Sequence, residues 1–191
     1  MGAITRTLAN NITTGGVITS SGINNSSLSS VTALPSGVGG TVLQVQSTTL
    51  TNNFTVTNGS SQTAITGLSV SITPASTSNK ILIMYKLMFS NSNGHGCTFH
   101  LQRGGSEIIT HDSGSTGIRA FASGNVENSN SYWAFDWGGS ALDTPSSTSS
   151  LSYGLFVRNP TSQTIWFNRT NRLGSDDVLG VSTITAMEIA G

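Results

Sequence analysis

The sequence predicts an all-β protein: a jelly-roll-like β-sandwich preceded by a short extended N-terminal segment. Two observations predict this fold class. From Gly40 onward, apolar residues alternate with polar residues in short runs, which is the period of strands that bury one face. Glycine- and asparagine-rich turn signals separate these runs, and no run has the period of a long helix. About eight to ten short strands with such turns are typical of a sandwich or jelly roll.

The expected strands follow one another along the chain. The first covers residues 42–46, and the next places Leu68, Val70 and Ile72 on one face before it ends at Pro74. The later strands carry the alternating sets Cys97, Phe99 and Leu101; Trp133, Phe135 and Trp137; Leu151, Tyr153, Leu155 and Val157; Ile165 and Phe167; and residues 181–189. Turns are expected at residues 91–94, 104–105, 114–117, 138–139 and 159–160.

One expected strand, residues 80–89, is apolar on both of its faces. The first face carries Ile81, Ile83, Tyr85, Leu87 and Phe89, and the second carries Leu82, Met84 and Met88. A strand that is apolar on both faces must be covered on both. A single sandwich covers only one of them, so we predict that Leu82, Met84 and Met88 lie in an interface between subunits.

Charge is scarce and balanced along the chain. Eight basic and eight acidic residues make up 8% of the 191 residues, whereas charged residues make up about 25% of typical soluble domains. We therefore expect no nucleic acid partner, and we expect no membrane insertion because no apolar run is long enough. A neutral, hydroxyl-rich surface does not repel its own copies, which suits symmetric assembly. The alternative is a secreted β-protein that tolerates this composition.

The first part of the chain differs from the rest in charge, because Arg6 is the only charged residue before Lys80. We expect residues 1–38 to form an extended anchor or short stalk and residues 39–191 to form the knob. Apolar residues recur through the anchor, and we predict that they pack against identical copies or a larger protein: Ile4, Leu8, Ile12, Ile18, Ile23 and Leu28. The alternative is a flexible low-complexity tail.

Four stretches of the knob are similar to a known family. They are residues 39–46 (GGTVLQVQ), 66–74 (TGLSVSITP) and 76–83 (STSNKILI), and the last ten residues, 182–191 (STITAMEIAG). In this order they resemble a module found at the C-termini of tail-fibre-like and other structural proteins of tailed bacteriophages, many of them marine. Residues 101–105 also resemble a hairpin of that family, and Asn168-Arg169 resembles its penultimate strand.

The resemblance implies a homotrimeric jelly-roll knob, similar in outline to the heads of tumour necrosis factor and C1q. It implies a non-enzymatic appendage on the virion surface, assembled in the bacterial cytoplasm. The N-terminal segment would attach to a capsid or tail protein, and the knob would face outward toward a glycan or protein of the host surface. Fewer than forty residues precede the knob, which favours a compact appendage over a long tail fibre. The alternatives are a capsid decoration protein and a polysaccharide-degrading spike enzyme.

The titratable residues suggest no catalytic set, and we predict no metal and no cofactor. His111-Asp112-Ser113-Gly114 is expected to be a hairpin turn rather than a nucleophile loop. His95, His100 and His111 lack the spacing of a helical metal site. The alternative is an ion on the axis of a trimer, where one histidine from each subunit could bind it. Four acidic residues are the candidates for paired carboxylates of glycoside cleavage: Asp136, Asp143, Asp176 and Asp177.

The aromatic residues near position 135 have two interpretations. Trp133 and Trp137 alternate along one strand and are expected to fill the core or an interface. Tyr132 points to the opposite face, beside the polar segment 123–131. An aromatic ring beside amide-rich loops suits stacking on a sugar ring, so Tyr132 is the candidate for host-surface contact.

Overall fold

A computed structural model of the chain describes residues 41–57, 59, 61–91, 96–109, 122–125, 134–159, 163–172 and 174–191. These residues belong to a unit that runs from Gly39 to Gly191. Their secondary structure is all-β, and none of them is helical. No helix in this part of the chain is therefore long and apolar enough to span a membrane. The predicted anchor, residues 1–38, lies outside the described residues and stays a prediction.

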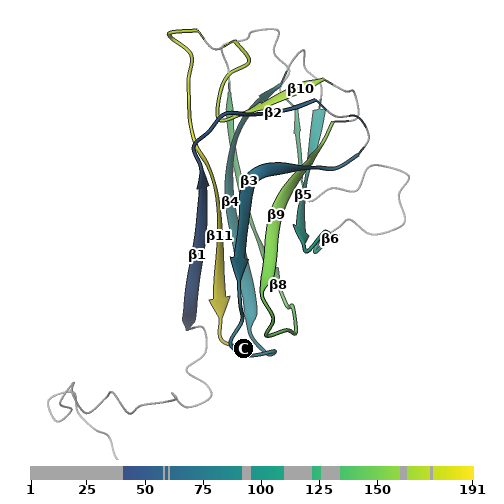
Figure 1. Cartoon of the computed structure of the whole chain (residues 1–191), viewed down its shortest axis with the longest axis vertical. Helices are drawn as coiled ribbons and strands as arrows, with labels where there is room; N and C mark the ends of the chain where they lie inside the picture. The colour runs from purple at the N-terminus through teal and green to yellow at the C-terminus, as the bar shows by residue number, and fades with distance from the viewer. Residues whose placement is uncertain are drawn as a thin grey trace, which may run out of the picture. The chain divides into compact units, whose positions relative to one another are not determined.

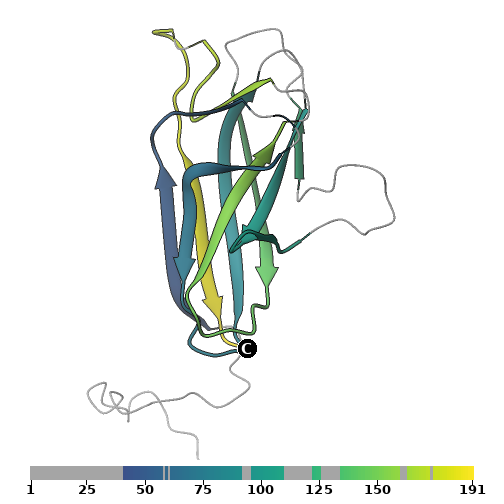
Figure 2. The ribbon, with the colours of Figure 1, turned by 45° about the vertical axis from the view of Figure 1, so that its right-hand side comes forward.

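The strands form two antiparallel sheets that pack face to face (Figures 1 and 2). Sheet A contains β1 (Val42–Leu50), β2 (Phe54–Thr57), β4 (Lys80–Asn91), β8 (Phe135–Asp143), β10 (Thr164–Phe167) and β11 (Ser182–Ile189). Sheet B contains β3 (Thr63–Ile72), β5 (Gly96–Arg103), β6 (Ser106–Glu107), β7 (Ala122–Asn125) and β9 (Leu151–Arg158). The prediction of a β-sandwich is confirmed.

The order of strands within the sheets explains the jelly-roll character. Across sheet A the order is β1-β11-β4, with β8 on the other edge of β4 and the short β10 and β2 continuing beside its end. Across sheet B the order is β3-β9-β5, followed by β6 and β7. The chain passes from one sheet to the other between β3, β4, β5, β8 and β9, as it does in jelly rolls.

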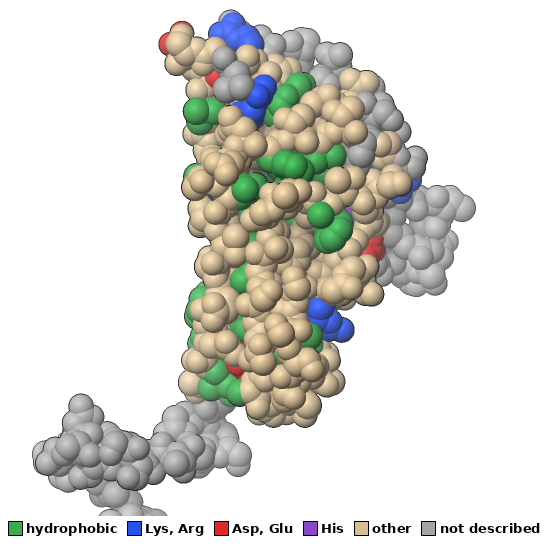
Figure 3. Space-filling view, in the orientation of Figure 1, with side chains coloured by type: hydrophobic (Ala, Val, Ile, Leu, Met, Phe, Trp, Pro, Cys, Tyr) green, Lys and Arg blue, Asp and Glu red, His purple; other side chains and the backbone are tan. Residues whose placement is uncertain are grey.

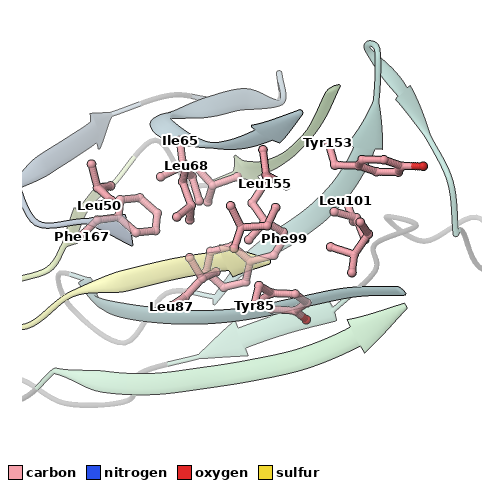
Figure 4. Packing of buried hydrophobic residues seen from close by; sticks show 14 of the residues in the cluster. Leu50, Ile65, Leu68, Tyr85, Leu87, Phe99, Leu101, Tyr153, Leu155 and Phe167 are labelled. Carbon is pink, nitrogen blue, oxygen red and sulfur yellow. The ribbon is translucent and has the colours of Figure 1, made fainter. Parts of the chain in front are cut away.

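The core lies between the sheets and is built from the predicted alternating faces (Figure 4). Phe99 occupies its centre, with its ring centroid 5.0 Å from that of Phe89 and 5.1 Å from that of Trp137. Trp137 is half-buried and also lies 5.6 Å from the ring of Tyr85. The prediction that Trp137 fills the core is confirmed, whereas Trp133 lies outside the described residues.

The prediction of a turn at residues 138–139 is wrong, because both glycines lie inside β8. Gly139 stands opposite Tyr85 of β4. A Cβ atom at Gly139 would lie 2.6 Å from the Tyr85 hydroxyl oxygen, so only a glycine leaves room for this ring. Gly138 also packs closely against β4, since a Cβ atom added there would lie 3.0 Å from the Tyr85 carbonyl oxygen.

The other expected turns have different outcomes. Gly104 and Gly105 form the predicted turn between β5 and β6, with φ angles of 57° and 89° that favour glycine. The resemblance implied that Asn168 and Arg169 lie in the penultimate strand, but neither does, because β10 ends at Phe167. The expected turns at residues 91–94, 114–117 and 159–160 lie wholly or partly outside the described residues.

A buried carboxylate ties together the strands and loops near the C-terminus of the chain. Glu188 accepts hydrogen bonds from Gln44 Nε2 (2.5 Å), Asn79 Nδ2 (2.5 Å) and the Ala75 amide (2.6 Å). The Gly191 amide in turn donates to Asn79 Oδ1 (3.2 Å). Burial alone would raise the pKa of Glu188, but these three donors outweigh it and hold the pKa below its ordinary value.

Candidate functional site

The outer face of sheet A carries a row of apolar side chains that crosses four strands. Val45 of β1 pairs with Met187 of β11, Met187 pairs with Leu82 of β4, and Leu82 pairs with Leu142 of β8. Met84 stands in the next row, where it is opposite Thr185 and Ser140. Because their chain neighbours Ile81, Ile83 and Ala141 fill the core, these side chains point outward.

We call Val45, Leu82, Met84, Leu142 and Met187 the apolar band. Val45 and Leu142 are each 50% exposed and Met84 is 44% exposed. Leu82 and Met187 are half-buried between them. The band is therefore a continuous apolar strip that the described residues leave uncovered.

A shallow hollow of about 450 Å³ lies around Met84 on this face. Small residues of the neighbouring strands surround it: Gly139, Ser140, Thr183 and Thr185. Met187 and the stem of Lys86 complete its sides. The hollow exists because small residues flank a long Met side chain, and it could accept a protruding apolar group.

The outer face of sheet A carries few charges: Lys80 and Lys86 on β4 and Asp136 on β8. Lys86 forms an ion pair of 2.9 Å with Asp136, and both side chains are largely exposed. Such a pair contributes little to stability. It does neutralise the only two charges close to Met84 on the described strands, so two copies of this face would not repel each other.

The three predicted interface residues have different surroundings. Leu82 and Met84 lie in the apolar band, but Met88 is only 5% exposed and is covered by its own chain. The segment after β10 covers it. The backbone amide of Asn168 donates to the Met88 carbonyl (2.9 Å), and Gly180 packs directly on the Met88 sulfur. Met88 therefore lies outside the exposed apolar surface of the subunit, and its place in an interface stays a prediction.

Three members of the band, Val45, Leu142 and Met187, were missed by the sequence reasoning. The alternation in residues 42–46 and 181–189 signalled strands but did not show which residues stand beside Met84. That information lies in the register between strands that are distant in the sequence.

Three of the four candidate carboxylates, those of Asp136, Asp143 and Asp177, have partners of their own. Asp136 and Asp143 lie at opposite ends of β8, about 23 Å apart along the strand, whereas the two carboxyl groups of glycosidases are about 5–9.5 Å apart. Asp143 binds Arg103 (2.5 Å) and the Tyr153 hydroxyl (2.6 Å). Asp177 accepts a hydrogen bond from the Gly174 amide and lies 3.6 Å from Arg172 Nε, with its side chain buried.

His100 is the described histidine, and it is fully used within the fold. Its ring is 1% exposed, with Nδ1 2.8 Å from Glu107 Oε1 and Nε2 3.0 Å from Thr98 Oγ1. Burial lowers the pKa of His100 more than Glu107 raises it, so the ring is neutral near pH 7. A substrate could not reach this imidazole. Among the described residues no group of three or more metal-ligating side chains occurs.

Several predicted residues lie outside the described part of the chain, and their roles stay predictions. They are Tyr132, Trp133, His95, His111, the segment 112–114 and the anchoring residues Ile4, Leu8, Ile12, Ile18, Ile23 and Leu28.

Comparison with known proteins adds no identification. No protein-family model matches the chain, and no curated protein matches it.

Proposed function

We propose that the chain is a non-enzymatic structural protein that forms a homotrimer through the outer face of sheet A. The single observation that carries this proposal is the apolar band, which crosses four strands of a face that carries few charges. Contiguous exposed apolar surface of this kind marks interaction sites in soluble proteins. A second copy of the same chain is the simplest partner, because the face is largely apolar and carries few charges that would repel its copy.

The shape of the band suits a closed ring. A three-fold ring needs two different patches on each subunit, so that one patch meets the other patch of the next copy. Val45 lies on β1 and Leu142 lies on β8, the two edge strands on either side of the β11-β4 pair. One end of the band can therefore pack against the opposite end in a neighbour. The trimer itself is implied by the resemblance to phage knob modules.

The biological role follows from the same resemblance. We propose that the protein is a compact appendage on the surface of a tailed-phage virion, attached by residues 1–38 to a capsid or tail protein. The knob would face outward, toward a host-surface glycan or protein. The low content of charge and the prevalence of uncharged polar surface on the face drawn in Figure 3 support a role in dense symmetric assembly.

Light scattering and native mass spectrometry on the full chain test the assembly. We expect a mass of three chains at micromolar concentration. A stable monomer would contradict the proposed trimer. A cryo-electron microscopy map of the whole virion tests the location, and the copy number in it separates an appendage from a capsid decoration protein, which needs tens to hundreds of copies.

A further inference from the structure

A second hollow lies on the outer face of sheet B, on the opposite side of the sandwich from the apolar band. Its volume is about 300 Å³, which is at the small end of ligand pockets. It lies where β3 leaves its register with β9. Ala64 pairs with Phe156 and Ser69 pairs with Gly154, so four residues of β3, 65–68, stand against Leu155 alone.

A glycine allows this departure from the register. Gly67 has a φ of 84°, a conformation that other residues rarely adopt. The extra residues curve away from β9 and open the surface of the sheet beside it. The wall formed by the β5–β6 turn is held in place, because the Gly104 amide donates a 2.9 Å hydrogen bond to the Ser152 carbonyl.

The floor of this hollow is apolar. Phe156 and Gly154 are two residues apart on β9 and share its outer face. A Cβ atom at Gly154 would lie 3.5 Å from Phe156 Cε2 and 3.7 Å from Ser69 Cβ, so the aromatic ring leans over the glycine. The ring is half-buried and keeps an accessible surface.

Neutral polar groups surround that floor. Thr66, Ser69 and Ser152 are exposed and place hydroxyl groups at its edge. Gln102 lies buried at one side, and its amide nitrogen donates to Gln62 Oε1. Its carboxamide oxygen is then the atom of this side chain that is left to accept a hydrogen bond from a ligand.

No charged side chain belongs to the described lining of the hollow. A phosphate, carboxylate or ammonium group would find no counter-charge there and would lose hydration on entering. A neutral ligand that combines an apolar face with a hydroxyl-bearing edge fits all of these features. We propose that this hollow binds a single neutral sugar ring, with the C–H face on Phe156 and the hydroxyl groups toward Ser69, Ser152 and Gln102.

The inference goes beyond the proposed assembly, since it concerns the other sheet and holds for a monomer or a trimer. It deepens the proposed contact with a host-surface glycan by naming a neutral sugar and its place on the fold. It also differs from the predicted contact at Tyr132, which lies outside the described residues. Failure of sugar binding would leave the proposed trimer standing, and a monomer in solution would leave the proposed sugar site standing.

Saturation-transfer difference NMR on the full chain tests the proposal. The neutral probes are the methyl glycosides of glucose, galactose, mannose and N-acetylglucosamine, and the charged probes are glucuronic acid and N-acetylneuraminic acid. We expect saturation transfer to the C–H protons of at least one neutral probe, and weaker transfer to both charged probes. No transfer to any neutral probe at millimolar concentration, or stronger transfer to the charged ones, would overturn the proposal.

Two variants locate the binding. Phe156→Ala removes the stacking surface and should weaken the affinity of the bound sugar roughly tenfold. Gly154→Ala fills the floor, and its new methyl group meets its neighbours only at ordinary contact distances, so the fold is retained while affinity falls. Phe135→Ala is the matched control, because Phe135 is an exposed aromatic residue of sheet A.

Thermal unfolding of each variant shows that the fold is intact before binding is measured. If Phe156→Ala does not fold, Gly154→Ala alone decides the question. Unchanged affinity in the folded variants, or an equal loss in Phe135→Ala, would show that the sugar binds elsewhere.

Discussion

The hydroxyl of Tyr153 donates a 2.6 Å hydrogen bond to Asp143 Oδ2, and this bond joins the two sheets of the sandwich. Tyr153 belongs to β9 of sheet B and Asp143 belongs to β8 of sheet A. Arg103 of β5 binds the same carboxylate oxygen at 2.5 Å. Burial, with a further contribution from Asp143, raises the pKa of Tyr153, so the phenol stays protonated and keeps donating.

The first prediction concerns this link. Tyr153→Phe removes one donor to a charged acceptor and should lower the free energy of unfolding by about 2 kcal/mol. Asp143→Asn weakens both of its bonds. In a double-mutant cycle, measured by urea unfolding, the two changes should show a coupling of about 1 kcal/mol or more. Strictly additive losses would mean that the hydrogen bond contributes nothing to stability.

The second prediction concerns the glycine opposite Tyr85. Gly139→Ala forces a methyl group against the Tyr85 ring and should lower the free energy of unfolding by about 2 kcal/mol. Adding Tyr85→Phe removes the hydroxyl oxygen, the nearest atom, and should recover part of that loss. Gly154→Ala is the matched control in the other sheet and should change stability by less than about 0.5 kcal/mol. Equal effects of the two glycine substitutions would contradict the close approach.

The third prediction tests the apolar band. Met84→Lys places a charge without a partner in the proposed interface and should weaken trimer formation by on the order of a hundredfold. The isolated subunit should keep its stability, because Met84 is exposed in it. Val178→Lys is the control, since Val178 is an exposed apolar residue outside the band. Analytical ultracentrifugation measures both variants, and intact Met84→Lys trimers would show that this face lies outside the interface.

The fourth prediction concerns acid stability. His100 has a folded pKa below 6.5 and Glu188 has one below 4.5. The unfolded chain therefore binds these protons first, and folding stability declines as pH falls. The contribution of His100 to stability is complete above pH 6.5 and is lost as pH falls through its folded pKa. Burial and Arg158 lower that pKa, whereas Glu107 raises it. The contribution of Glu188 is complete above pH 4.5 and is lost as pH falls through its folded pKa.

Urea unfolding between pH 7 and pH 3 measures this decline. Glu188→Gln cannot accept all three hydrogen bonds and should lower the free energy of unfolding by about 2 kcal/mol at pH 7. Below pH 4.5 its stability should change less with pH than that of the natural chain. A variant with the same slope as the natural chain in that range would show that Glu188 does not titrate on unfolding.

The strands and their inward faces could be predicted from residue alternation alone. Period-two patterns around Leu68, Phe99, Tyr153 and Phe167 indicated which side chains enter the core, because a strand sends successive side chains to opposite faces. The low content of charged residues could also be determined from the sequence alone. These properties are local in the sequence, so a single segment suffices to determine them.

The candidate site depended on contacts between distant segments. Val45, Met187, Leu82 and Leu142 form one row only because β1, β11, β4 and β8 pair in a particular register. Met88 has the same alternation as Met84 but is covered by the segment that ends at Gly180. Alternation determined that both methionines lie on the outer face. Only the tertiary structure decided which of them stays exposed, because burial depends on which remote part of the chain packs above each side chain.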